Sequence, residues 1–208
     1  MKRLFVLLAV PFLGLACSPT TDNNTSLQGN NSAMNHDTMN HSEMNHADMK
    51  SSPNAASAPY DLQFLDTMMA HHQGAVEMAK MIDSRTKNAE LKKFGAQIIA
   101  DQEKEIAQMK AWREKWFAGK PPAMNMEMRG MANSMKMDMS KLSAAKDAEF
   151  DLAFVEMMIP HHDGAVEMSK EALEKAKQPE IKTLSNQIIK AQQAEIKMMQ
   201  GWKTAWAK

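Results

Sequence analysis

Apolar and polar positions between residues 61 and 116 follow a helical period within a charged, helix-favouring stretch. The stretch is interrupted once, at residues 83–88, where Asp, Ser and Asn supply capping and turn chemistry. After the interruption, one face repeats at i, i+3, i+4 and i+7. That face consists of Gln102, Glu105, Ile106, Met109, Trp112 and Trp116. The pattern predicts a helical hairpin over residues 60–117.

The same pattern returns 90 positions later, and the two copies align without a gap. The matching face consists of Gln192, Glu195, Ile196, Met199, Trp202 and Trp206. A second hairpin is predicted over residues 145–208, with a turn near 177–179 and a kink at Pro160. Because blocks of about 60 residues are marginal as separate cores, we expect the two to share one core. The predicted fold is all-α, a four-helix bundle in up-down-up-down order made of two repeated hairpins.

Each copy carries a pair of adjacent histidines flanked by methionines. On a helix, these side chains fall within an arc of about 120°. They are Met68, His71, His72 and Met78 in the first copy and Met158, His161, His162 and Met168 in the second. A thioether is a soft donor suited to Cu(I), whereas imidazole also accepts divalent copper, zinc, iron or nickel. Methionine on such a face usually fills a core, but the joint, repeated pattern predicts a metal site, with copper or its soft analogue silver as the cation.

A carboxylate also recurs on each apolar stripe, at Glu105 and at Glu195. Such a placement is costly unless the charge is paired or coordinates an ion. We therefore take Glu105 and Glu195 as site candidates that accept ring N–H groups of the histidines and orient them toward a metal.

The N-terminus has the pattern of a secretory signal over residues 1–16, where basic residues precede an apolar run that ends on a small residue. The run is too short for a comfortable membrane span. Cys17 follows at once, and residues 13–17 resemble a bacterial lipobox with Gly14 where leucine is usual. We expect export and lipidation of Cys17, with membrane contact only through the lipid anchor. An ordinary signal peptide that leaves a free thiol is the alternative.

Two segments outside the hairpins are rich in methionine. Residues 17–59 have few aliphatic side chains and predict a disordered tether, in which a five-residue repeat offers further candidate ligands at His36, His41 and His46. Low-complexity drift is the alternative origin of this repeat. Residues 118–144 predict a flexible, thioether-rich linker that captures copper, or else a partly helical one whose methionines cover the bundle.

Composition narrows the functional classes. The chain has 208 residues with 25 basic and 25 acidic side chains, so no global field favours nucleic acid or an anionic membrane surface. Its 22 methionines are the outlier. A single cysteine excludes an intrachain disulfide, and no Ser/His/Asp arrangement can be assigned for nucleophilic catalysis.

The repeated motif M-x-x-H-H-x-G-A-x-x-M, followed by Q-x-x-E-I-x-x-M-x-x-W, resembles the domain-of-unknown-function 305 (DUF305) family over residues 59–116 and 145–206. The resemblance implies a ferritin-like four-helix bundle, as in copper-binding periplasmic proteins of the CopM type, that sequesters or delivers Cu(I) outside the cytoplasm. By motif position it adds Met109 and Met199 to the candidate ligands. Metal ions, and other copper-transport or resistance proteins, are then the expected partners.

Two other functions stay open. A ferritin-like di-metal oxidase needs inward Glu residues and Glu-x-x-His on two helices. The sequence has that spacing only at Glu43 and His46, within the tether. We therefore expect no enzyme activity, and oxygen-dependent turnover of bound Cu(I) would indicate a copper oxidase instead. A metal-free envelope interaction module would tolerate replacement of all the paired histidines.

Overall fold

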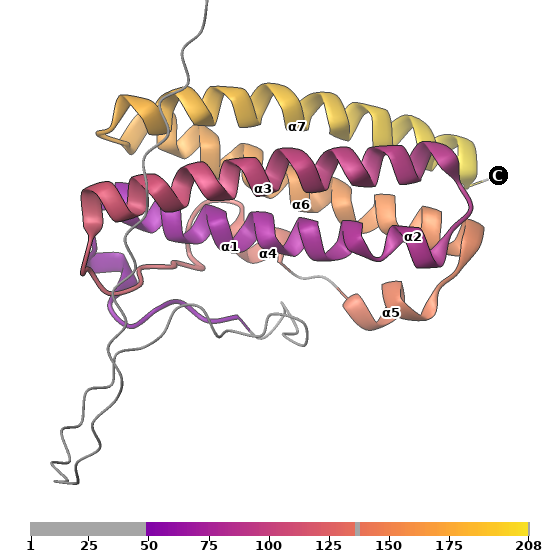
Figure 1. Cartoon of the computed structure of the whole chain (residues 1–208), viewed down its shortest axis with the longest axis horizontal. Coiled ribbons are helices and arrows are strands. Elements are labelled where there is room, and N and C mark those ends of the chain that lie inside the picture. The colour runs from indigo at the N-terminus through magenta and orange to yellow at the C-terminus, as the bar shows by residue number, and fades with distance from the viewer. Residues whose placement is uncertain (1–48, 136–137, 208) are drawn as a thin grey trace, which may run out of the picture. The chain divides into compact units, whose positions relative to one another are not determined.

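The computed structural model describes residues 49–135 and 138–207 (Figure 1). The predicted signal sequence, Cys17 and the tether histidines His36, His41 and His46 lie outside the described residues. Within the described part, no helix is both long enough and apolar enough to cross a membrane.

Four long helices make up the fold: α1 (Tyr60–Lys80), α3 (Ala89–Phe117), α6 (Asp147–Lys175) and α7 (Pro179–Trp206). The shorter helices are η3 (Ala55–Ser57), α2 (Ile82–Arg85), α4 (Met131–Ser134) and α5 (Met139–Ala144). Helix α1 packs against α3, and α6 against α7, so each sequence repeat is a helical hairpin (Figure 1). No strand occurs in residues 49–135 or 138–207. The predicted all-α four-helix bundle is confirmed.

Residues at the N-terminus of the second helix of each hairpin determine where that helix begins. The Asn88 side chain accepts the backbone N–H groups of Glu90 (3.1 Å) and Leu91 (3.2 Å), which caps α3. Helix α7 begins instead at Pro179, whose fixed φ and missing N–H suit the first helical position. Helix α6 continues through Pro160, although the proline ring leaves no N–H for the carbonyl four residues back.

The hairpins are arranged so that the start of each first helix meets the turn of the other hairpin. Asp61, at the start of α1, accepts the backbone N–H groups of Lys177 (2.9 Å) and Gln178 (3.0 Å). At the start of α6, Asp151 Oδ2 accepts the side-chain N–H of Asn88 at 2.9 Å. Helices α1 and α6 therefore run in opposite directions, and the order is up-down-down-up instead of the expected alternation (Figure 1).

The connection over residues 118–146 makes this order possible. It leaves the end of α3 and delivers the chain to the start of α6, which lies beside Asn88 at the start of α3. Helix α3 has 29 residues and so spans about 44 Å, which a connection of similar residue number can cover when extended. The result is an approximate twofold relation between residues 90 positions apart.

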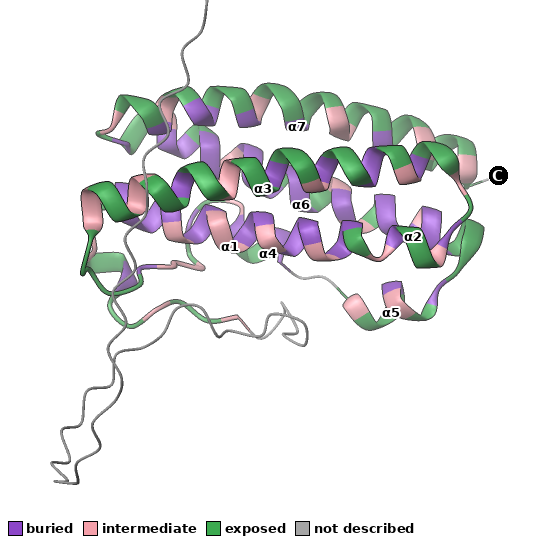
Figure 2. Ribbon diagram, in the orientation of Figure 1, coloured by how far each residue is buried: buried purple, intermediate pink, exposed green. Residues whose placement is uncertain are grey.

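Apolar side chains from the four long helices fill the interior. Figure 2 marks the buried residues along these helices. The connection adds to this core, because Met128, Met131 and Met135 are 5%, 0% and 2% exposed. These three methionines do not form an exposed thioether-rich loop, so the expectation of a flexible linker is wrong for them. They pack against the bundle, as the alternative expectation described, because a long thioether side chain fills irregular gaps well.

Polar contacts attach the first part of the connection to α1. Asp66 forms an ion pair with Arg113 of α3, with 2.6 Å between Oδ1 and Nε, and its Oδ2 accepts the Ala123 N–H at 2.8 Å. Thr67 Oγ1 accepts the Asn125 N–H at 2.9 Å. Backbone groups that would otherwise be orphaned at the edge of the core are thereby satisfied.

Candidate metal centre

The two histidine pairs meet in the interior of the bundle. His71, His72, His161 and His162 are all 0% exposed. His71 of α1 lies against His161 of α6, with 3.8 Å between ring centroids and 32° between ring planes. Within each pair the centroids are 6.3 Å apart. The twofold relation thus joins both copies of the motif in one buried cluster of imidazoles.

Each second histidine contacts the recurrent carboxylate of its own hairpin. His72 Nε2 lies 2.7 Å from Glu105 Oε2, and His162 Nε2 lies 2.8 Å from Glu195 Oε2. Both carboxylates are mostly shielded, with side chains 20% and 19% exposed. The structure therefore places Glu105 and Glu195 on imidazoles, as expected for groups that orient a histidine ring.

These contacts select the tautomer of the two imidazoles. An ionised carboxylate only accepts hydrogen bonds, so Nε2 carries the proton in each ring. In the neutral imidazole, the lone pair is then on Nδ1. The Nδ1 atoms of His72 and His162 are buried and have no hydrogen-bond partner among the described residues. Each is chemically suited to ligate a metal ion.

His71 contacts a serine of helix α4. The Ser134 hydroxyl donates to the carbonyl of Met131 at 3.0 Å and lies 2.9 Å from His71 Nε2. Because a hydroxyl has one proton, Ser134 Oγ accepts the N–H of His71 Nε2. Ser134 was not among the sequence candidates. It belongs to the connection, which has no repeated partner, so no sequence pattern marked it.

Two methionines lie level with each other, about one helical turn from the histidine–carboxylate contact. Helices α1 and α3 are antiparallel, so Met68, four residues before His72, lies level with Met109, four residues after Glu105. Both methionines are 0% exposed. Each hairpin thus holds one buried histidine and two buried methionines within about one helical turn of each other. The set on α6 and α7 consists of Met158, His162 and Met199.

The other two candidate methionines lie further from the imidazoles. Met78 and Met168 are 0% exposed but follow His71 and His161 by seven residues, about 10 Å along the helix axis. They share the helix face with these histidines, as the sequence predicts. They do not belong to the sets defined by the carboxylate contacts.

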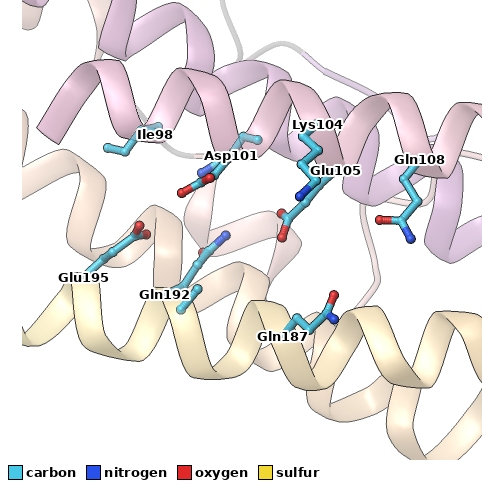
Figure 3. A pocket seen from close by; sticks show the side chains of 10 residues that line it. Ile98, Asp101, Lys104, Glu105, Gln108, Gln187, Gln192 and Glu195 are labelled. Atoms are coloured by element: carbon cyan, nitrogen blue, oxygen red, sulfur yellow. The ribbon is translucent and has the colours of Figure 1, made fainter. Parts of the chain in front are cut away.

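A polar groove of about 440 Å³ opens between α3 and α7 (Figure 3). Glu105 and Glu195 project into the space between the two helices (Figure 3). Gln102 and Gln192 also line this α3/α7 groove. The two glutamines recur at the repeat spacing on the predicted inner face, which was the available sequence signal for them.

Within the described residues, His, Cys, Asp and Glu side chains alone, the four buried histidines included, do not form a metal site. No group of three or more His, Cys, Asp or Glu residues within 49–135 and 138–207 is placed to hold a metal ion. The donor sets described above each combine an imidazole with thioethers.

Comparison with known proteins places the chain in a family. The family described as "Domain of unknown function (DUF305)" matches residues 16–113 and 61–203. Together these matches cover most of the chain and include both histidine pairs. The chain belongs to the DUF305 family. The resemblance of the repeated motif to this family is confirmed.

Solved DUF305 structures share the fold. CopM in its Cu(II)-bound form is 41% identical, with a TM-score of 0.61, and the match covers 70% of this chain and 97% of CopM. CopM has also been solved in Cu(I)-bound and Ag-bound forms, each 37% identical with a TM-score of 0.61. A DUF305 protein from Streptomyces coelicolor is 27% identical, with a TM-score of 0.64 over 74% of this chain and 95% of that protein.

A shorter match occurs to an uncharacterized protein, L153, of Acanthamoeba polyphaga mimivirus. It is 45% identical over 49 residues, which are 24% of this chain and 32% of L153. The match therefore spans about a third of that relative's length.

Proposed function

We propose that this DUF305 protein binds copper in the core of its bundle, at two equivalent donor sets. One set is His72 Nδ1 with the sulfurs of Met68 and Met109. The other comprises His162, Met158 and Met199. The observation that carries the proposal is the buried Nδ1 atom of His72 and of His162, which has no hydrogen-bond partner among the described residues. Orphaned polar atoms are rare in protein cores, and a bound metal ion satisfies this one.

The donor types favour Cu(I), with Ag(I) as its soft analogue. Thioether sulfur selects soft monovalent ions, while the imidazole nitrogen also accepts Cu(II). The pair His71 and His161 lies between the two sets and offers further imidazole donors. The CopM structures with Cu(II), Cu(I) and Ag support this choice of cation.

The proposed role is sequestration or delivery outside the cytoplasm, without catalysis. The signal-like residues 1–16 support export, and Cys17 is the proposed lipid anchor. Full burial of the donors suits storage of an ion away from solvent. Copper-loaded protein is therefore expected to show no sustained oxygen uptake, measured with an oxygen electrode, and continued turnover would favour a copper oxidase.

The direct test is an anaerobic Cu(I) titration of the mature chain against a coloured chelator. The informative variant is His72→Gln with His162→Gln. Glutamine can still donate an N–H to each glutamate but has no counterpart of Nδ1. We expect Cu(I) affinity to fall by about 100-fold or more, beyond the effect usually seen when a ligand's supporting partner is lost.

The control places two substitutions on the exposed surface of α3 and α7. Lys110 and Gln200 are exposed, and replacing both by alanine leaves the proposed donor sets intact. Because surface substitutions are nearly neutral, the Cu(I) affinity should stay within about twofold of that of the wild type. Equal affinity in the wild type and the double glutamine variant would refute the donor sets. Absence of Cu(I) uptake by the wild type would refute copper binding itself.

A further inference from the structure

The buried donor sets leave open how an ion reaches them. All four histidines and both sets of methionines are 0% exposed. On the α4 side the packing is tight, because a Cβ built on Gly164 would lie 2.3 Å from Ser134 Cβ and 2.9 Å from the Gly130 carbonyl oxygen. Ser134 itself is 2% exposed. An ion cannot pass there without displacing α4.

The α3/α7 groove offers a connection between solvent and the histidines. Glu105 and Glu195 line it, and their Oε2 atoms contact the buried rings of His72 and His162. Each carboxylate is about one-fifth exposed, at 20% and 19%. A single side chain on each side therefore touches both the groove and a proposed ligand.

Two glutamines that line the groove have side-chain oxygen atoms without a hydrogen-bond partner among the described residues. Gln102 and Gln192 are each 4% exposed, and their Oε1 atoms are buried with no hydrogen-bond partner among the described residues. An amide buried in this way is costly unless something else bonds to it. Amide and carboxylate oxygens suit a cation that still carries water molecules.

The charge of the groove also favours a cation. Asp101, Glu105 and Glu195 line it against one basic residue, Lys104. Figure 3 shows these charged side chains along the facing sides of α3 and α7. Clefts lined by one sign of charge raise the local concentration of oppositely charged ions.

We propose that the α3/α7 groove is the entry site at which a copper ion, with part of its hydration shell, binds before it passes to the buried imidazoles. The amide oxygens of Gln102 and Gln192 replace water on the ion. Glu105 and Glu195 then lie between the groove and the buried rings of His72 and His162. This inference rests on the proposed copper-binding function and adds the route to it.

The test compares rates with equilibrium affinity, using Ag(I) as a redox-inert probe in chloride-free buffer. The variant is Gln102→Leu with Gln192→Leu, which removes both amide oxygens but no proposed ligand. Uptake is followed by stopped-flow tryptophan fluorescence, and release by transfer to excess chelator. We expect both rates to fall by about tenfold, as an added barrier in a shared path requires, with an unchanged dissociation constant.

The matched control is Gln193→Leu with Gln200→Leu, two exposed glutamines of α7 that do not line the groove. Both rates should equal those of the wild type. A second variant, Lys104→Gln, removes the basic residue of the groove at an exposed position. It should speed uptake about twofold at low ionic strength and have no effect at high salt, where charges are screened.

Unchanged rates in the groove variants would overturn the route. Faster release with weaker affinity but normal uptake would also overturn it, because the amides would then belong to the holding site. Should the double leucine variant fail to fold, the Lys104→Gln rates decide alone. Absence of Ag(I) and Cu(I) binding by the wild type would instead refute the proposed function.

Discussion

At the scale of single residues, Glu105 determines which nitrogen of His72 is available to a metal. Replacing Glu105 by alanine removes the acceptor 2.7 Å from Nε2. Loss of such a supporting partner typically lowers metal affinity by about 10–100-fold. We expect this loss at the first donor set, measured by anaerobic Cu(I) competition, with partial recovery in Glu105→Gln, whose amide oxygen still accepts the N–H.

The control for this prediction is Glu103→Ala. Glu103 lies on the same helix and pairs with Lys80 at 3.1 Å, with both side chains more than half exposed. Its replacement should leave Cu(I) affinity unchanged. Equal losses in the two alanine variants would mean that the Glu105 contact has no specific role.

The methionines allow a substitution that removes sulfur but keeps shape. Replacing Met68 and Met109 together by leucine should cost under about 1.5 kcal/mol each in stability and abolish tight Cu(I) binding at the first set. Met81→Leu with Met128→Leu is the matched control, because both residues pack in or against the core outside the donor sets. Calorimetric titration should show full stoichiometry in the control, and undiminished binding by the first variant would exclude its thioethers as ligands.

The sequence predicted part of this chemistry. Glu105 stood out because a carboxylate on an apolar stripe needs a partner, and the structure supplies His72. The close contact of His71 with His161 could not be predicted, since it depends on how the two hairpins are placed. Ser134 escaped notice because a serine in an irregular connection carries no periodic signal.

At the scale of elements, the packing of α4 on α6 depends on Gly164. A Cβ there would lie 2.3 Å from Ser134 Cβ and 2.9 Å from the Gly130 carbonyl oxygen. Gly164→Ala should therefore destabilise the fold by about 1–3 kcal/mol through overpacking. Urea denaturation, with the midpoint and slope both fitted, measures this change.

Gly201→Ala is the matched control for this prediction. Gly201 lies within α7, and a Cβ built on it meets no atom within 4 Å. The substitution should stabilise the protein by about 0.5–1 kcal/mol, because alanine favours the helix over glycine. A Gly164→Ala variant as stable as wild type would show that α4 is not held closely against α6.

The long helices could be predicted from the sequence. For the connection, the sequence left two alternatives open, and burial of its methionines was one of them. Helical periodicity and the Asn88 cap signal mark the hairpins directly. Met128, Met131 and Met135 have the i, i+3, i+7 spacing of one helix face, but the alternating methionines on either side of them obscure it. Sequence alone did not distinguish buried packing groups from exposed thioethers.

At the scale of the whole molecule, Asp61 and Asp151 join the two hairpins at opposite ends. Asp61 accepts two backbone N–H groups of the α6–α7 turn, so Asp61→Ala should cost about 2–3 kcal/mol of unfolding free energy. Asp151→Ala should cost less, about 1–2 kcal/mol, because Asp151 Oδ1 is buried without a hydrogen-bond partner among the described residues. Chemical denaturation compares the two, and equal or reversed costs would contradict this assignment.

The direction of the hairpins explains the difference between the expected and observed order. A repeat spacing of 90 residues fixes the correspondence of His71 and His161 but permits either relative direction. The contacts of Asp61 and Asp151 with the turn of the other hairpin fix the antiparallel arrangement of α1 and α6. These contacts join residues more than 60 positions apart, which a periodic pattern does not reveal.

The most direct test of the copper site is a crystal structure of the Cu(I)-loaded protein, with diffraction recorded at the copper absorption edge. Two anomalous peaks are predicted in the bundle core. One should lie between His72 Nδ1 and the sulfurs of Met68 and Met109, and the other at the equivalent set on α6 and α7. Copper peaks found only outside the bundle core would contradict the proposed donor sets.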